Sequence, residues 1–121
     1  MTLEGKVAIV TGGTKGVGLG VARELARQRA RVFLTGRSAP EYENLDDRTT
    51  AIRCDHRDDV QVDAAFRRIL AEAVTIDILV NSAWGGYERM MEDGSFTWGR
   101  PFWEQPRWRW DAMFAAGVRA H

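Results

Sequence analysis

The feature that most constrains the fold of this chain is a glycine-rich turn between a short apolar segment and an amphipathic one. Residues 7–10 (Val-Ala-Ile-Val) are apolar and largely β-branched, which predicts a buried strand. Gly12, Gly16 and Gly18 follow, and residues 16–29 have apolar side chains at every fourth position, which predicts a helix with one inner face. The inner positions are Val17, Val21 and Leu25. A glycine turn that leaves a strand and opens a helix is typical of phosphate-binding turns in dinucleotide-binding folds.

The alternation of strand and helix continues along the chain. Residues 31–35, 50–54 and 76–81 predict three further strands, and residues 58–73 predict a helix that begins at an aspartate. Residues 38–49 are polar, contain a proline and predict a loop with at most one helical turn. Strands that alternate with helices in this way predict a parallel sheet with right-handed crossovers. A last helix is predicted around Trp110, Met113, Phe114 and Val118.

Composition excludes several classes of protein. A chain of 121 residues predicts a single domain, and 17 basic against 17 acidic residues give no net charge to attract nucleic acid or an anionic membrane. The one cysteine, Cys54, allows neither an intrachain disulfide nor a cysteine-based zinc site. Beside it, His56 is predicted at the surface, and no metal site is expected. The apolar runs are too short for a membrane span or a signal peptide, so a cytoplasmic protein is expected.

Each glycine of the turn has a predicted role. Gly12 permits the tight turn, and the missing side chain at Gly16 lets backbone N–H groups approach a phosphate at the helix N-terminus. Gly18 lets helix and strand pack closely. A P-loop is excluded because Leu19, and not lysine, follows Gly18. The alternative is a glycine-rich turn without a ligand.

The spacing Thr11-Gly-x-x-x-Gly-x-Gly18 resembles the turn of the short-chain dehydrogenase/reductase (SDR) family. Residues 3–13 are similar to that family's first strand, and Asn81-Ser82-Ala83 is similar to its Asn-Asn-Ala-Gly motif, with departures at Ser82 and Trp84. Residues 102–111 are similar to one subgroup, that of dehydrogenase/reductase family member one. The resemblance covers the whole chain and the N-terminal half of the family.

The resemblance implies an α/β fold of the Rossmann type, a doubly wound parallel sheet with about four strands in the order 3-2-1-4. It also implies hydride transfer between a nicotinamide cofactor and a small carbonyl or alcohol substrate. Asp55 matches the acidic residue that meets the adenine ring in the family. The predicted cofactor-binding residues are Thr11, Gly12, Thr14, Lys15, Gly16, Val17, Gly18, Arg37, Asp55, Asn81 and Ala83.

The residues after the second strand predict NADP(H) over NAD(H). An acidic residue about 20 positions beyond the glycines holds the ribose 2′-hydroxyl of NAD, whereas arginine accommodates the 2′-phosphate of NADP. Arg37 occupies this place and no carboxylate lies in residues 34–39. Lys15, within the glycine turn, is a second cation for the same phosphate. The alternative is that both are solvated surface charges.

The catalytic residues of the family are not found in this sequence. The family uses a Tyr-x-x-x-Lys pair and a serine, but the two tyrosines, Tyr42 and Tyr87, have Asp46 and Met91 four residues later. The chain is therefore predicted to be an N-terminal fragment or truncated product, or a catalytically inactive nucleotide-binding module. Its fourth strand would be an apolar sheet edge, through which a second copy or a partner chain would pair.

Residues 84–110 hold eight of the twelve aromatic residues, including all five tryptophans, and are interpreted as an insertion. Two functions remain open for this segment: a wall or lid of the substrate pocket, and packing onto the sheet edge or in a dimer interface. A stacking platform for nucleic acid is disfavoured, because four arginines are balanced by four acidic residues.

Overall fold

A computed structural model describes residues 2–39 and 46–121 of the chain. The chain divides into two compact units, Met1–Ala83 and Trp84–His121. The boundary between them falls where the aromatic-rich segment was predicted to begin. The expectation that both belong to one dinucleotide-binding domain stays a prediction. Pro40 and Tyr42, which the sequence placed in a loop, lie outside the described residues.

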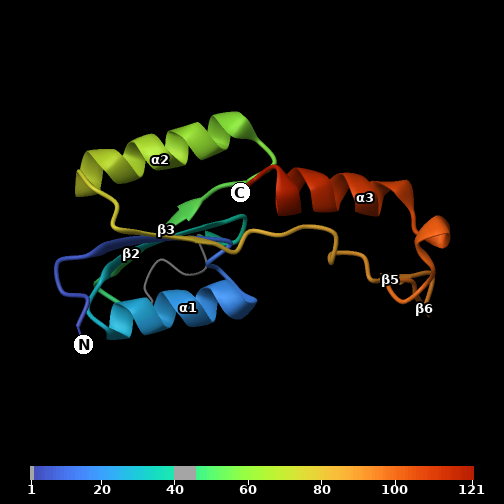
Figure 1. The fold of residues 1–121 in the computed structure, drawn as a ribbon, viewed down its shortest axis with the longest axis horizontal. Coiled ribbons are helices and arrows are strands. Elements are labelled where there is room, and N and C mark those ends of the chain that lie inside the picture. The colour runs from blue at the N-terminus through green and yellow to red at the C-terminus, as the bar shows by residue number, and fades with distance from the viewer. Residues whose placement is uncertain (1, 40–45) are drawn as a thin grey trace. The chain divides into compact units, whose positions relative to one another are not determined.

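The first unit is a four-stranded parallel sheet with one helix on each face. Its strand order is β3-β2-β1-β4, so the predicted order 3-2-1-4 is confirmed. Figure 1 shows α1 and α2 on opposite sides of the strands. The elements are β1 (Val7–Thr11), α1 (Gly16–Arg27), β2 (Arg31–Gly36), β3 (Thr49–Arg53), α2 (Asp59–Ala73) and β4 (Ile78–Asn81).

Alternation along the central strands produces two apolar layers. Ile9 of β1 and Phe33 of β2 belong to a buried cluster with Ile69 of α2. Their neighbours along the strands, Ala8 and Val32, belong to the cluster on the other face, which includes Ala22 and Ala26 of α1. Because both faces are covered, β1 is buried along its whole length, as a near-continuous apolar strand requires.

The helix α1 uses a different inner face from the one predicted. Its buried residues are Gly18, Ala22 and Ala26, whereas Val17 is 80% exposed. The prediction of Val17 as an inner position is therefore wrong. Small side chains at every fourth position let the helix backbone approach the sheet closely, and this shifts the buried stripe by one residue from the larger apolar side chains. Val21 and Leu25 are partly buried beside it.

The second unit, residues 84–121, contains short elements. A hairpin is followed by a short helix, which contains Trp110 and Met113 of the predicted last helix, whereas Phe114 and Val118 lie in the π-helix that continues it. Asp93 and Gly94 connect the two strands of the hairpin with φ values of 49° and 75°, as an Asp-Gly turn with two left-handed residues allows. The elements are β5 (Met91–Glu92), β6 (Ser95–Phe96), the 3-10 helix η2 (Phe102–Glu104), α3 (Arg107–Met113) and the π-helix η3 (Phe114–Val118).

In residues 2–39 and 46–121, no helix has the length and apolar character needed to cross a membrane. No group of three or more His, Cys, Asp or Glu side chains is arranged there to hold a metal ion.

Candidate functional site

The carboxyl ends of the four parallel strands meet along one edge of the first unit. The strands end at Thr11, Gly36, Arg53 and Asn81. In open α/β sheets, ligands bind outside this edge, at the point where the strand order reverses. That point is β1 here, because β2 pairs with one side of it and β4 with the other. The glycine turn leaves the sheet directly from β1.

Two glycines of the turn are required by close backbone contacts. Gly12 has a φ of 65°, and a Cβ there would lie 2.6 Å from the carbonyl oxygen of Ser82. A Cβ at Gly18 would overlap the carbonyl oxygen of Gly12. Gly12 therefore supports the tight turn as predicted. Gly18 packs against the turn itself, so the close approach that it allows is between α1 and the Gly12 peptide.

Gly16 differs from both, because a Cβ at this position would meet no atom within 4 Å. The N-terminus of α1 is also open: its N-cap residue, Lys15, makes no side-chain capping hydrogen bond, and the first turn carries no acidic residue. The first N–H groups of a helix lack intrahelical partners and carry partial positive charge. The turn therefore presents backbone donors with free space beside them, a geometry that fits a phosphate group.

Buried polar side chains hold the turn against β4 and β2. The Thr11 hydroxyl accepts the N–H groups of Ser82 (3.1 Å) and Ala83 (3.2 Å), and it donates to the carbonyl oxygen of Val80 (3.5 Å). Thr14 is buried, and a Cβ at Gly36 would overlap its hydroxyl oxygen. Thr11 and Thr14 through their side chains, and Ala83 through its backbone, are thus framework residues of the turn.

A second set of predicted residues is exposed along the same edge. Lys15, Val17, Arg37 and Asn81 all have exposed side chains. Arg37 directly follows the end of β2, the strand next to β1. Arg37 therefore lies at the same end of the sheet as the turn. The edge therefore combines backbone donors with two cations, Lys15 and Arg37.

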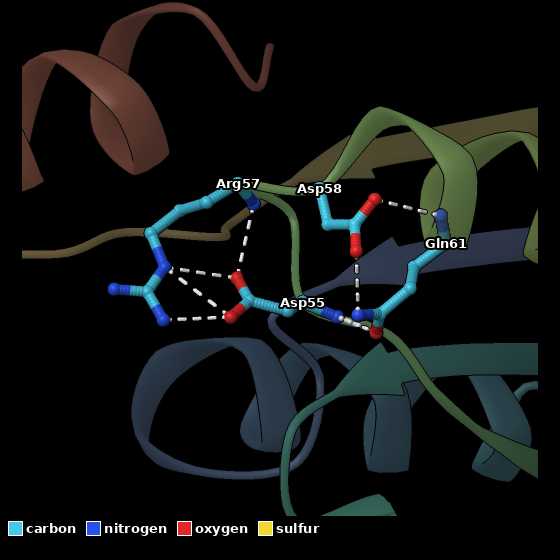
Figure 2. A network of polar contacts seen from close by, with 4 residues as sticks. All are labelled: Asp55, Arg57, Asp58 and Gln61. Atoms are coloured by element: carbon cyan, nitrogen blue, oxygen red, sulfur yellow. Dashed lines mark hydrogen bonds and ion pairs between the residues drawn. The ribbon is translucent and has the colours of Figure 1, made fainter.

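Asp55, two residues beyond β3, is the acidic group of this edge (Figure 2). The Arg57 guanidinium binds its carboxylate through Nε–Oδ1 (3.0 Å) and Nη2–Oδ2 (2.7 Å). These hydrogen bonds are the main cause that lowers the pKa of Asp55 from 3.8 to about 2. The backbone N–H of Arg57 and the positive charges of Arg57 and Arg37 act in the same direction, and burial opposes them. Asp55 is therefore ionised at neutral pH and presents an acceptor.

Two neighbours of Asp55 are buried. Cys54 is a core residue as predicted, and burial, with the charges of Asp55 and Asp58, raises the pKa of its thiol to about 11. His56 is only 8% exposed, so its prediction as a surface residue is wrong. One of its ring nitrogens, Nε2, lies 2.7 Å from the hydroxyl of Thr35 on β2. The sequence carried no pattern that paired these two residues, because Thr35 lies within β2 whereas His56 lies in the segment between β3 and α2.

The structure brings all eleven predicted residues to one edge of the first unit but divides them by environment. The glycines and the buried threonines shape the turn, the exposed cations flank it, and Asp55 is half-buried beside them. Sequence reasoning missed Arg57 and Gln61, which bind Asp55 and its backbone. An arginine two residues after an aspartate is a local pattern that could have indicated the first of these pairs.

Comparisons with known proteins agree with this geometry. The sequence model described as short chain dehydrogenase matches residues 6–120. The chain is 32% identical to dehydrogenase/reductase SDR family member 1 of Mus musculus, over 98% of this chain and 39% of that protein. It is 43% identical to the oxidoreductase UcpA of Escherichia coli K12, over 67% of this chain and 33% of that protein.

The fold also matches a solved structure. The 3-ketoacyl-(acyl-carrier-protein) reductase from Brucella melitensis, complexed with NADH, superposes with a TM-score of 0.80 at 27% identity, over 98% of this chain and 46% of that one. The chain thus spans less than half the length of these relatives. With the match over nearly all of its residues, the parallel sheet and the glycine turn, the chain belongs to the short-chain dehydrogenase family.

Proposed function

We propose that this chain is the cofactor-binding part of an NADP(H)-dependent oxidoreductase. The observation that carries the proposal is the open glycine turn at the N-terminus of α1, flanked by the exposed cations Lys15 and Arg37. The Brucella relative, a reductase complexed with NADH, supports a nicotinamide dinucleotide as the class of ligand. The lack of a carboxylate in residues 34–39 favours the phosphorylated form.

The residues of this edge suit the parts of such a cofactor. The backbone of the turn and the α1 N-terminus would hold the pyrophosphate, while Lys15 and Arg37 would hold the 2′-phosphate. Asn81 lies at the end of β4, across the switch point from the cations. When bound, the nicotinamide ring exchanges a hydride at C4 with a carbonyl or alcohol carbon.

The test is a calorimetric titration of the full chain with NADPH and with NADH. We expect NADPH to bind at least about tenfold more tightly, because a hydrogen bond to a charged group contributes roughly 1.5–3 kcal/mol. Arg37→Glu should abolish this preference. Arg48→Glu is the matched control, because Arg48 is exposed just before the amino end of β3, at the opposite edge of the sheet. An Arg37→Glu chain that retains its NADPH affinity would overturn the assignment.

The second candidate is a nucleotide-binding module without catalysis, favoured by the lack of a Tyr-x-x-x-Lys pair among the 121 residues. Oxidation of NADPH with a panel of small carbonyl compounds separates the two candidates. Turnover that Gly16→Trp abolishes would reject the inactive module, because the indole ring would fill the free space beside Gly16. No turnover with any carbonyl, together with intact NADPH binding, would favour it.

A partner at the β4 edge remains part of the proposal. Within the described residues, β4 pairs with β1 alone, and Leu79 on it is 52% exposed. Unpaired strand edges with apolar side chains recruit other chains. Sedimentation of the full chain should therefore show self-association. A monodisperse monomer would contradict this part of the proposal.

A further inference from the structure

Asp55 is held by three neighbours, Arg57, Asp58 and Gln61. Its backbone N–H donates to Oε1 of Gln61 (3.0 Å), and its carbonyl oxygen accepts the N–H of Asp58 (3.0 Å). Gln61 is itself fixed, because its Nε2 donates to Oδ2 of Asp58 (2.9 Å), the residue that caps α2. Figure 2 shows these residues as one network. The backbone of Asp55 is thus fixed independently of its carboxylate.

The carboxylate itself is held by Arg57 alone among the contacts described above. Oδ1 accepts the backbone N–H and the Nε–H of Arg57, both at 3.0 Å. Oδ2 accepts the Nη2–H at 2.7 Å and lies 3.3 Å from Nε, whose N–H is shared between the two oxygens. The planar guanidinium binds both oxygens side by side, so it fixes the plane of the carboxylate as well as its position. A carboxylate has about four lone-pair sites, and three N–H groups of Arg57 bind this one. The shared Nε–H lies closer to Oδ1 than to Oδ2, so one site on Oδ2 remains for a further donor.

The place of Asp55 indicates which donor this is. If Arg37 at the end of β2 holds the 2′-phosphate, the base on the same ribose lies toward the next strand outward, which is β3. Asp55 follows β3 and lies close enough to Arg37 for that charge to lower its pKa. Adenine carries an exocyclic amino group, a donor suited to an ionised acceptor.

We infer that Arg57 is a positioning residue for base recognition: it aligns the Asp55 carboxylate so that Oδ2 accepts the exocyclic amino group of the cofactor's adenine. This inference rests on the proposed cofactor-binding function and adds a residue to it. Arg57 does not touch the cofactor in this arrangement. It acts through Asp55, whose carboxylate would otherwise turn about its Cβ–Cγ bond.

The experiment compares NADPH with its hypoxanthine analogue, in which a carbonyl oxygen replaces the amino group. A site that accepts a hydrogen bond from the amino group should reject an analogue that presents an acceptor instead. We expect the wild-type chain to bind NADPH at least about tenfold more tightly than the analogue. Asp55→Ala should bring this ratio close to one. Arg57→Ala should lower it to about two or three, and Arg57→Lys should give an intermediate value, because an ammonium cannot bind both oxygens in one plane.

A matched control and a second readout separate positioning from a general structural effect. Asp63 and Arg67 form an ion pair on the exposed side of α2, so Arg67→Ala removes the same kind of pair away from the site. It should leave the ratio unchanged. Carbon-13 NMR titration of Asp55 supplies the second readout: Arg57→Ala should raise its pKa from about 2 toward 3.8, and Arg67→Ala should leave it unchanged.

Each outcome decides a different point. If Arg57→Ala lowers the affinity for NADPH and for the analogue equally, the inference is overturned, since Arg57 would then be a structural residue. An Arg57→Ala chain that binds NADPH more weakly but NADH as tightly as the wild type would overturn the inference in favour of a direct contact between Arg57 and the 2′-phosphate. One that binds NADPH more tightly would show that Arg57 competes with the base. If the wild-type chain binds neither NADPH nor NADH, the proposed function fails and the inference with it.

Discussion

The two units of this chain are stabilised by different kinds of interior. In residues 1–83, aliphatic and aromatic side chains of a parallel sheet are fully buried on both faces, as for Ile9 and Phe33. In residues 84–121, the most buried charged group is Arg109, which is 3% exposed and lies 5.2 Å from the ring of Trp98 and 5.0 Å from that of Trp108. The first unit is held by apolar burial, the second by one cation among aromatic rings.

Arg109 also supplies the hydrogen bonds that connect the second unit. Its Nη2 donates to the carbonyl oxygen of Arg89 (3.0 Å) and to the hydroxyl of Thr97 (2.9 Å), and its Nη1 donates to Oε1 of Gln105. Arg89 lies just before the β5–β6 hairpin, Thr97 just after it and Gln105 just after η2. A small unit can thus be ordered by a polar centre while many of its large side chains stay exposed, among them Phe102 and Trp103.

The largest expected effect comes from the apolar interior. Phe33→Ala should lower the free energy of unfolding of the first unit by about 3–5 kcal/mol, because it leaves a cavity at the centre of the sheet. Denaturant titration followed by far-ultraviolet circular dichroism measures this loss. If the interiors are independent, amide exchange in residues 84–121 should not change. Equal loss of protection in both units would contradict two independent interiors, because it would show a single cooperative one.

The second effect concerns the polar centre. Arg109→Met keeps much of the side-chain volume but leaves several buried acceptors without a donor, so it should destabilise residues 84–121 by about 2–3 kcal/mol. Near-ultraviolet circular dichroism of the tryptophans reports this change. Arg107→Met is the control on the same helix, since Arg107 is exposed. A change within about 0.5 kcal/mol for both variants would show that the aromatic rings hold the unit without the cation.

A smaller effect is expected at the start of α2. Asp58 accepts the N–H groups of Val60 (2.9 Å) and Gln61 (3.4 Å), so Asp58→Ala should cost about 1 kcal/mol in the free energy of unfolding. Thermal denaturation measures this loss. Asp63→Ala, on the exposed side of the same helix, should change stability by less than about 0.5 kcal/mol. Equal costs for the two variants would show that the cap is not what sets the start of α2.

The smallest effect is the pH dependence of the Asp55–Arg57 pair in the first unit. The folded pKa of Asp55, about 2, is below its ordinary value of 3.8, so the pair contributes stability above about pH 4 and loses it as the pH falls toward 2. Asp55→Asn should lower the melting temperature slightly at pH 5, by the equivalent of less than about 1 kcal/mol, because the pair is partly exposed. The difference from wild type should shrink at pH 2.5. A difference that stays constant with pH would show that the pair does not act through its charge.

The strands and helices of the first unit were predicted well because their apolar sequence pattern agrees with the faces that are buried. Short apolar strands, a glycine turn and an aspartate at a helix start each have a local cause, and the strand order followed from the family resemblance. The errors arose where a choice depended on neighbours. Val17 is exposed because the sheet approaches smaller residues of α1. His56 is buried beside β2, where its ring forms a hydrogen bond with the hydroxyl of Thr35.

The second unit was predicted less well, for a related reason. The start of α3 and the Asp93-Gly94 turn have local causes. The dense aromatic residues, however, follow no helical or strand periodicity, so the sequence does not indicate which of them are buried. The structure buries Arg109 and exposes Phe102 and Trp103, the reverse of what hydrophobicity alone predicts. Cation–aromatic contacts depend on the geometry of several segments together, so no local pattern reveals them.

The sequence by itself determined the parallel sheet, the glycine turn, the cations at the strand ends and the family, because each depends on residues close together in the chain. Only the tertiary structure decided which of the eleven candidate residues form the framework and which face a ligand. It alone placed the Thr35 hydroxyl beside the His56 ring and Arg109 among the tryptophans. These contacts join side chains whose separations are set by the packed backbone, and a linear pattern holds no information about that distance.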